Sequence, residues 1–570
     1  MCEGPIKSGS ALAFFMTSSN TRALHLRRID AAGLLKLSAP FVLLAVLLIP
    51  SIWMLAVIPP LWRDVDAYLQ VTRPPGAETI LQYGPLYCFG ARIPLYLGYA
   101  IDSVRAGHTL PDLQFFVHPV LTDSGVFLLL VVQHAALCFA GFYLITLATG
   151  TFWVRLILAV AWAANPLLYT LAHCVGGETL SMILIVLVGA TGLRVIRYSG
   201  NVPKKECFLV GILLWGCALT RQINAVLAGL LPLTFVLLAL YRLSAVRFPG
   251  YQSRARWNRL RSKRAFQKAM VAIAIGISSI VLANATRGIL CYAAKIPYHS
   301  VAGFAFVDRL KFLAALPVEQ RDQLIDEASK NANSADVRDL ISILRNEFTG
   351  RAGSWDSSAF KNRVRASFKG DLGQQQRFYH ALNGMIAAFV WPPSKPFLGA
   401  VATDFERSQR IRIPEVVAFL FVTTRFYFLH RDAMPQYSSL TTFRDKNADQ
   451  IFAIFKKHSY FRHPKNVSYR DFLFIWIVLL AAFVVIAKIR KLDVAGVASF
   501  AIALIVIAIL MMLANCLLAV FQPRYTLPMW ELTIVSLFIL FGGTVNAFLC
   551  RSGRLHSSEP NEQRKGSAQV

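Results

Sequence analysis

Two aspartates stand two residues apart directly after the first long apolar run, in Pro59-Pro60-Leu61-Trp62-Arg63-Asp64-Val65-Asp66. A carboxylate at the rim of an apolar cavity is partly desolvated, and it can act as a general base or bind a divalent cation. The same side chains could instead cap the following helix by accepting backbone N–H bonds. The spacing leaves both roles open for Asp64 and Asp66.

A glutamate and an arginine stand at the ends of later apolar runs. Glu178 opens an uncharged stretch, and Arg221 lies in the polar turn at 220–224. A carboxylate inside a membrane is costly and is therefore a functional candidate, although the helix dipole also favours Glu in a first turn. A guanidinium can hold a phosphate through two hydrogen bonds, or it can simply reach toward lipid headgroups. Both readings stay open for Glu178 and Arg221.

A second arginine lies in a short turn near the C-terminus, Phe521-Gln522-Pro523-Arg524-Tyr525-Thr526-Leu527-Pro528. The two prolines restrict the backbone of this turn, so that Arg524 has a fixed position. A fixed guanidinium near a membrane surface suits a lipid-linked phosphate. Arg524 and its neighbour Tyr525 are therefore candidates for phosphate or substrate binding.

The elements that must position these residues are long and apolar. The chain of 570 residues is 55% hydrophobic and 16% charged, with a mean hydropathy of +0.50. Stretches such as 40–58, 179–193 and 494–521 contain no charged residue. A helix of roughly 20 such residues satisfies its own backbone and crosses a bilayer. The composition therefore predicts an all-α polytopic membrane protein.

We predict about ten membrane-spanning helices from the apolar runs. The stretch 207–241 is divided into two of them, because it is too long for one ordinary span and has basic residues at both ends. The predicted spans are 39–58, 122–149, 153–172, 178–196, 206–220, 223–241, 269–289, 471–488, 496–520 and 528–549.

Lysines and arginines gather in alternate gaps between these spans, most densely at 242–268. By the positive-inside rule these gaps are cytoplasmic, and both termini are then cytoplasmic too. The net charge of +28 follows from loops that meet anionic headgroups. With no recognisable nucleic-acid-binding module, we expect membrane lipids as partners and no nucleic acid.

The spans divide the chain into five regions. A cytoplasmic N-terminus (1–38) precedes a transmembrane core (39–290), whose outer loop at 59–121 carries the paired aspartates. A long segment at 295–470 mixes both signs of charge and has helical periodicity, so we expect an extracytoplasmic helical domain. C-terminal membrane helices (471–549) and a disordered polar tail (550–570) follow.

The candidate residues together resemble the GT-C-fold membrane glycosyltransferases, which include protein O-mannosyltransferases and bacterial aminoarabinose transferases. The matching pieces are Asp64-Val65-Asp66, Gly177-Glu178, Leu219-Thr220-Arg221 and the turn from Pro523 to Pro528. The likeness covers about residues 40–290 and 470–550. Each piece is short, and their order and shared outer face carry the resemblance.

The resemblance implies transfer of a sugar, with inversion, from a polyprenyl-phosphate carrier to a lipid, glycan or protein acceptor in the cell envelope. Asp64, or else Asp66, would be the catalytic base, and either could contribute to a divalent metal site. Arg524, and with it Arg221 and Tyr525, would bind the carrier phosphate, while Glu178 would shape the pocket. The expected location is a bacterial inner membrane.

Other functions remain open on the sequence. An O-antigen polymerase or ligase also has a late outer loop and outer arginines, and it should tolerate alanine at both aspartates better. A lipid or solute transporter would need charged or broken helices near the middle of the bilayer. A scaffold could use 295–470 as a binding domain without any catalysis.

Overall fold

The computed structural model describes residues 31–62, 65–110, 112–198, 200–244, 252–349, 355–368, 371–429, 448–461 and 467–549. The chain divides into two units, Met1–Val42 and Leu43–Val570, and the contacts reported below lie within the second. The predicted tail at 550–570 lies outside the described residues. So does most of the predicted N-terminal segment, although a helix begins at Ala31 rather than at 39.

In the described part of the chain, eight helices are long and apolar enough to cross a membrane. Two of them begin with a tighter helical turn, η3 or η6. They are α1 (Ala31–Val57), α5 (Asp123–Ala148), α8 (Gly177–Arg197), η3 with α10 (Gln222–Gly229 and Leu230–Ser244), α11 (Gln252–Ala293), α23 (Tyr469–Ile489), α24 (Ala495–Leu518) and η6 with α25 (Pro523–Thr526 and Leu527–Leu549).

The predicted span 153–172 is not one straight helix. It consists of α6 (Phe152–Ala163) and α7 (Pro166–Ala172), which meet at an angle of 62°. A proline has no N–H to continue the first helix, and it disfavours helical backbone in the residue before it. The side chain of Asn165 accepts a hydrogen bond from Leu167 N (3.0 Å) and so starts the second helix afresh.

The predicted span 206–220 corresponds to α9 (Lys204–Thr220), whose 17 residues make it shorter than the eight helices above. It nevertheless connects two ends of the bundle. Near its start Glu206 pairs with Arg194 of the last turn of α8 (2.6 Å), and just after its end Arg221 pairs with Glu178 of the first turn of α8 (3.1 Å). We call the end that contains Glu178 and Arg221 the site end.

The basic gaps of the sequence meet at the opposite end of the bundle, which we call the basic end. Arg242 and Arg261 both approach Asp493 (3.8 and 3.6 Å), which lies between α23 and α24. Lys268 donates to the carbonyl of Tyr198, which follows α8 (2.7 Å). Three turns far apart in sequence therefore share one end, as the alternation of charge predicts.

Shorter elements cover the site end. Before α5 they are β1 (Leu61–Trp62), α2 (Val65–Thr72), η1 (Glu78–Gln82), α3 (Pro85–Gly90), α4 (Arg92–Arg105) and η2 (Leu113–Phe116); β2 (Cys174–Val175) precedes α8. After α11 they are α12 (Ala302–Arg309), α13 (Lys311–Ala314), α14 (Val318–Asn331), α15 (Ala335–Thr349), α16 (Ser357–Ser367), α17 (Leu372–Val390), α18 (Lys395–Arg410), α19 (Ile413–Leu429), α22 (Ala448–Lys457) and η5 (Ser459–Phe461).

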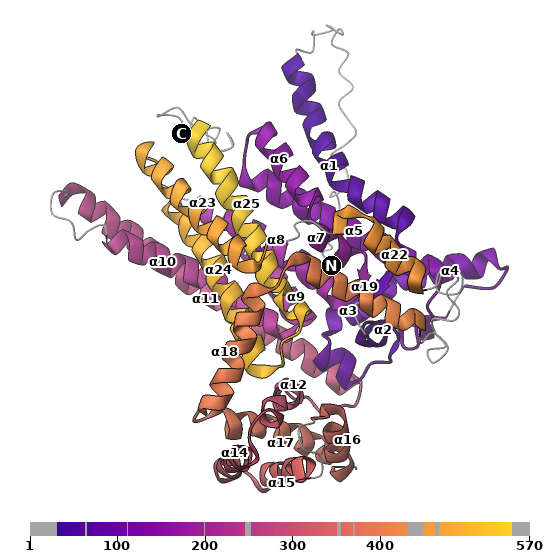
Figure 1. Ribbon diagram of the computed structural model, residues 1–570. Coiled ribbons are helices and arrows are strands. Elements are labelled where there is room, and N and C mark those ends of the chain that lie inside the picture. The colour runs from indigo at the N-terminus through magenta and orange to yellow at the C-terminus, as the bar shows by residue number, and fades with distance from the viewer. Residues whose placement is uncertain are drawn as a thin grey trace, which may run out of the picture. The chain divides into compact units, whose positions relative to one another are not determined.

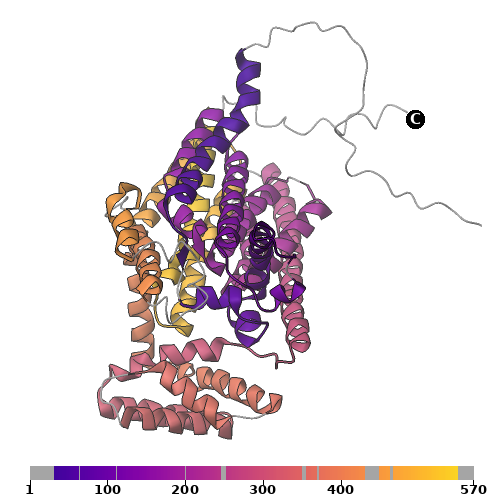
Figure 2. The same ribbon diagram turned by 90° about the vertical axis from the view of Figure 1, so that its right-hand side faces the viewer.

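The predicted segment 295–470 contains two kinds of helix. Helices α12 and α14–α17 pack mainly on one another, and Figure 2 shows them gathered beyond the ends of the long helices. Helix α18 instead packs on α23 and α24, while α19 packs on β1 and α7. A buried ion pair between Arg309 and Asp404 links α12 to α18, and Asp404 also accepts from Phe521 N (3.2 Å). These contacts anchor the chain just before the Arg524 turn.

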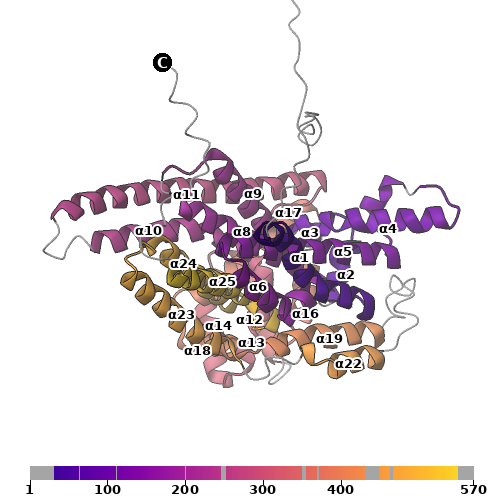
Figure 3. The ribbon, with the colours of Figure 1, turned by 90° about the horizontal axis from the view of Figure 1, so that it is seen from above.

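The architecture is therefore all-α, with a bundle of long apolar helices as a multi-pass membrane protein requires. In the described residues the strands are two segments of two residues each. At one side of the bundle α11 packs between α9 and α10, and Figures 1 and 3 both show α10 and α11 side by side.

Candidate functional site

A short parallel sheet joins the segment after α1 to the segment before α8. Leu61 pairs with Cys174, and Trp62 pairs with Val175. The backbone N–H of Trp62 also donates to the hydroxyl of Thr424 in α19 (3.0 Å). Because parallel strands run in the same direction, the chain continues from both strands at the same edge.

The two predicted catalytic aspartates follow the first of these strands. Asp64 lies outside the described residues, and for Asp66 the structure gives only its backbone place as the second residue of α2. In the sequence, Asp64 follows Trp62 by two residues. Since Glu178 follows the second strand by three residues, the sheet directs both segments toward one region.

Hydrogen bonds from three helices fix the turn that precedes Glu178. The hydroxyl of Tyr87 accepts from Gly176 N (2.8 Å) and donates to Gln133 Oε1 (3.1 Å). The side chain of Gln70 in α2 accepts from Gly177 N (3.0 Å). Burial raises the pKa of Tyr87, so its hydroxyl stays protonated and remains a donor. Helices α2, α3 and α5 thus hold the start of α8 in place.

A buried ion pair forms the centre of the candidate site. Arg221 Nη1 lies 3.1 Å from Glu178 Oε1, and the side chains are 22% and 3% exposed. Arg221 takes extended backbone between the end of α9 and η3. Glu178 lies in the first turn of α8, where the helix dipole stabilises a carboxylate. The pair joins two of the predicted site residues.

The turn at η6 brings the other two predicted residues to the same place. The guanidinium of Arg221 lies 5.9 Å from the centre of the Tyr525 ring, and that of Arg524 lies 5.4 Å from it. Aromatic faces attract cations at such distances. Both guanidinium groups therefore lie near one tyrosine ring, in a turn whose first position is Pro523.

Glu531 is a further acidic residue that the sequence analysis missed. It is 2% exposed in α25 and interacts electrostatically with both Arg221 and Glu178. Within the described residues its Oε2 atom has no hydrogen-bond partner. A carboxylate in an otherwise apolar span was itself a signal of function. The cluster thus contains two carboxylates and two guanidiniums, and we call Glu178, Arg221, Arg524, Tyr525 and Glu531 the charged cluster.

Gly84 allows the outer loop to approach this cluster closely. Its φ of +90° is one that residues with a side chain rarely adopt, and a Cβ there would overlap the carbonyl oxygens of Leu219 and Thr220. These carbonyls immediately precede Arg221. Pro85 then begins α3, as the sequence predicts for a Gly-Pro pair.

The sequence analysis also missed a series of hydrogen bonds that runs through two buried histidines. The ring of His134 lies 3.0 Å from Ser51 Oγ and 3.1 Å from His173, whose other nitrogen lies 2.9 Å from the carbonyl of Ile58. Because that carbonyl can only accept, one consistent arrangement has both rings neutral. Burial lowers the pKa of His173 to about 4, which agrees with a neutral ring. These hydrogen bonds connect α1 and α5 to the segment that precedes β2.

A cavity of about 560 Å³ lies between the outer loop at 73–82 and helices α12, α16 and α17. Its lining combines the cations Arg73 and Arg365 with aromatic rings. The aromatic lining residues are Phe304, Phe368, Phe378, Tyr379 and His299.

A hydrogen bond connects this outer cavity to the charged cluster. The side chain of Gln222, which follows Arg221, donates to the carbonyl of Leu81 (3.2 Å). Gln82, which follows Leu81, lines the cavity. Burial lowers the pKa of His299 to about 4, so its ring, stacked on Tyr379, is neutral at neutral pH. The cavity therefore offers flat apolar surfaces beside a few polar groups, as small-molecule sites commonly do.

Across the residues that the structure describes, no group of three His, Cys, Asp or Glu side chains could hold a metal ion. Comparison of the chain with protein-family profiles, characterised proteins and solved structures found no match.

Proposed function

We propose that this protein is an integral-membrane glycosyltransferase that resembles the GT-C-fold enzymes and takes its sugar from a polyprenyl-phosphate carrier. One observation carries the proposal. Glu178 and Arg221 precede Arg524 and Tyr525 by more than 300 residues, yet all four lie in one cluster. The strand β1, which leads into Asp64, pairs with the strand that leads into Glu178.

The proposed reaction begins with a proton transfer to Asp64, or alternatively to Asp66. The carboxylate accepts the proton of an acceptor hydroxyl or amine, whose oxygen or nitrogen attacks the anomeric carbon. The bond from that carbon to the phosphate oxygen breaks, and the configuration inverts. General base catalysis of this kind contributes about 10²–10⁴-fold to a rate.

The charged cluster would receive the leaving phosphate. A guanidinium placed where negative charge develops stabilises the transition state more than the ground state. Arg524 and Arg221 would supply two such groups, both close to the ring of Tyr525. Glu178 would balance Arg221 when the site is empty, because unbalanced buried charge is costly.

The outer cavity would bind the acceptor, and its aromatic rings suit the flat faces of sugar rings or lipid. The positive-inside rule places the basic end in the cytoplasm, so transfer would occur at the extracytoplasmic face of a bacterial inner membrane. A divalent cation, if the reaction uses one, would lie on Asp64 and Asp66.

The test is release of the carrier from a panel of radiolabelled polyprenyl-phosphate sugars by purified protein. We expect release by wild type, a strong loss in Asp64→Asn and Arg524→Gln, and unchanged release in Asp493→Asn. The last variant removes a carboxylate from the basic end and controls for charge. Equal release by wild type and Asp64→Asn would remove Asp64 from the mechanism. If the variant with alanine at both Asp64 and Asp66 kept full activity, the result would favour a polymerase or ligase instead.

Transport is a second candidate, which the 62° break between α6 and α7 favours, because transporters commonly have interrupted helices. Buried Glu531 inside α25 points the same way. Proteoliposomes separate the two functions. A transporter would move a fluorescent polyprenyl-phosphate sugar across the bilayer without cleaving its sugar, whereas the proposed enzyme would transfer the sugar to an acceptor and release the carrier phosphate.

A further inference from the structure

A second cavity, of about 420 Å³, lies at the basic end and takes no part in the proposed reaction. It lies among α8, α9, α10 and α11, close to the turn that connects α8 to α9. Its lining residues are Val195, Gly200, Asn201, Val202, Cys207, Val210, Leu231, Phe235, Arg264, Gln267, Lys268, Val271, Ala272 and Ile275.

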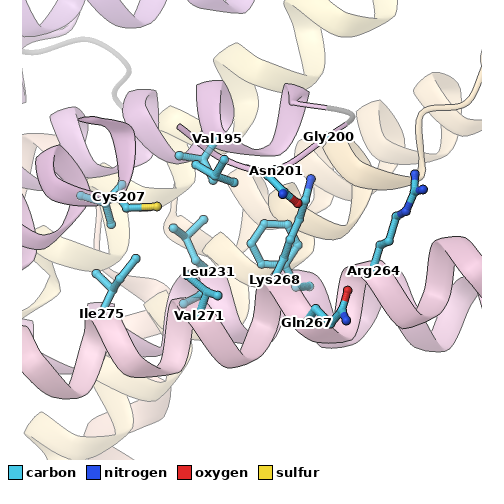
Figure 4. A pocket seen from close by; sticks show the side chains of 14 residues that line it. Val195, Gly200, Asn201, Cys207, Leu231, Arg264, Gln267, Lys268, Val271 and Ile275 are labelled. Atoms are coloured by element: carbon cyan, nitrogen blue, oxygen red, sulfur yellow. The ribbon is translucent and has the colours of Figure 1, made fainter. Parts of the chain in front are cut away.

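The lining changes from polar to apolar along the cavity. Figure 4 shows the polar side chains at one end and the aliphatic ones at the other. Along α11 the residues Arg264, Lys268, Val271 and Ile275 follow one another at helical spacing, so they form one stripe on the helix. Two cations thus lead directly into an apolar slot.

The cations at the mouth are suited to bind an anion. Arg264 is exposed, and in the described part of the chain it has no acidic partner. The Lys268 ammonium donates to the Tyr198 carbonyl, which holds it at the mouth, and lies 5.9 Å from the Phe235 ring. Neither contact neutralises its charge. An ammonium and a guanidinium one helical turn apart can share a phosphate.

The apolar part of the cavity identifies the rest of the ligand. Protein interiors are close-packed, so an apolar hollow of this volume is suited to a bound group. At the end of a membrane helix bundle, a hydrocarbon chain is the group that matches such a lining. A free phosphate would gain nothing from this slot, and a neutral lipid would gain nothing from the cations.

We propose that the cavity is a binding site for an anionic phospholipid. The phosphate lies between Arg264 and Lys268, with Asn201 and Gln267 within reach of the headgroup. One acyl chain lies along Val271 and Ile275. The site is independent of the proposed transfer reaction, since it lies at the opposite end of α8 and α9 from the charged cluster.

Binding is tested on the purified full-length chain in lipid nanodiscs. The probes are fluorescently labelled phosphatidylglycerol, labelled phosphatidylcholine, and unlabelled glycerol phosphate as a competitor. We expect retention of phosphatidylglycerol, weak retention of phosphatidylcholine, and no competition by glycerol phosphate. Equal retention of both lipids, or full competition by glycerol phosphate, would overturn the proposal.

Two matched pairs of variants locate the site. Arg264→Gln and Lys263→Gln each remove one exposed cation from neighbouring positions of α11, but only Arg264 lines the cavity. A cation near a membrane surface contributes about 1 kcal/mol to binding an anionic lipid, so we expect about fivefold weaker binding in Arg264→Gln alone. Equal weakening in both variants would mean that the basic surface attracts lipid without a site.

The second pair tests the slot without changing charge. Val271→Trp fills it, whereas Met270→Trp places the same ring at a neighbouring exposed position that does not line the cavity. We expect only Val271→Trp to weaken binding of phosphatidylglycerol. Thermal melting in detergent verifies that all four variants fold. Unchanged binding in folded Val271→Trp would exclude the slot as the place of the acyl chain.

Discussion

The two ends of the helix bundle carry charge in different ways. At the site end, Glu178 and Glu531 are 3% and 2% exposed and lie beside Arg221. At the basic end Glu206 is also buried, beside Arg194, whereas Arg261 and Asp493 are 54% and 57% exposed. Buried charges must be balanced by partners, because water cannot stabilise them. Exposed cations need no partner, since water and headgroups stabilise them.

Buried and exposed charges therefore have different roles in this protein. The buried Glu178–Arg221 pair, with Glu531 of α25 beside it, joins α8, η3 and α25 at the candidate site. By the positive-inside rule the excess of cations at the other end would set the orientation in the membrane, and we propose that it attracts anionic lipid. The predictions below test this contrast, beginning with the largest effect.

Replacing Asp64 by asparagine should have the largest effect on activity. If Asp64 is the general base, Asp64→Asn loses about 10²–10⁴-fold in the rate of sugar transfer, measured as carrier release in a single turnover. Asp66→Asn should lose less, because the neighbouring base remains. A larger loss of rate in Asp66→Asn than in Asp64→Asn would identify Asp66, and not Asp64, as the general base.

Breaking the buried ion pair should have the largest effect on stability. Removing one partner of a buried pair costs about 3–5 kcal/mol, because the other charge stays buried. Arg221 is 22% exposed, so water reaches it and the low end of that range applies to Glu178→Gln. The measurement is the shift in melting temperature of the purified protein.

The double variant Glu178→Gln with Arg221→Gln provides the control. Since it removes both charges, it should be more stable than the sum of the two single variants predicts, by about 1–3 kcal/mol. Strictly additive shifts would show that the two side chains do not interact, and the charged cluster would lose its central contact.

The close approach of the outer loop to Arg221 can be tested at Gly84. An alanine there meets the carbonyls of Leu219 and Thr220 and also requires φ of +90°. Gly107 also has a positive φ, +76°, but a Cβ there has no atom within 4 Å. We expect a backbone strain of about 1–3 kcal/mol in both alanine variants, and a further loss of stability and activity only in Gly84→Ala. Equal melting temperatures for the two variants would contradict the close contact.

Much of the bundle could be predicted because membrane helices are local features. Apolar length gives the spans, and a proline marks the start of a helix, as at Pro523 for the last span and at Pro85 for the short helix α3. The break within the predicted span 153–172 was not predicted, because a run of apolar residues gives no angle, and only the Asn165-Pro166 pair indicated it.

The site could be predicted in its members but not in its contacts. Glu178, Arg221 and Tyr525 are each recognisable from local sequence, yet their proximity depends on how α8, η3 and η6 pack. Glu531 was missed although its position in an apolar span was informative. The Arg309–Asp404 pair was beyond prediction, because two charged residues 95 positions apart carry no local signal.

The smallest effect is expected at the basic end. Asp493 is the shared partner of Arg242 and Arg261, at 3.8 and 3.6 Å, and is 57% exposed. Exposed ion pairs contribute about 0–1 kcal/mol because water screens them, so Asp493→Asn should barely change the melting temperature. Its effect should also vanish in high salt, whereas that of Glu178→Gln should persist because the pair at the site end is shielded from ions. If Asp493→Asn were as destabilising as Glu178→Gln, and equally insensitive to salt, burial would not distinguish the two ends.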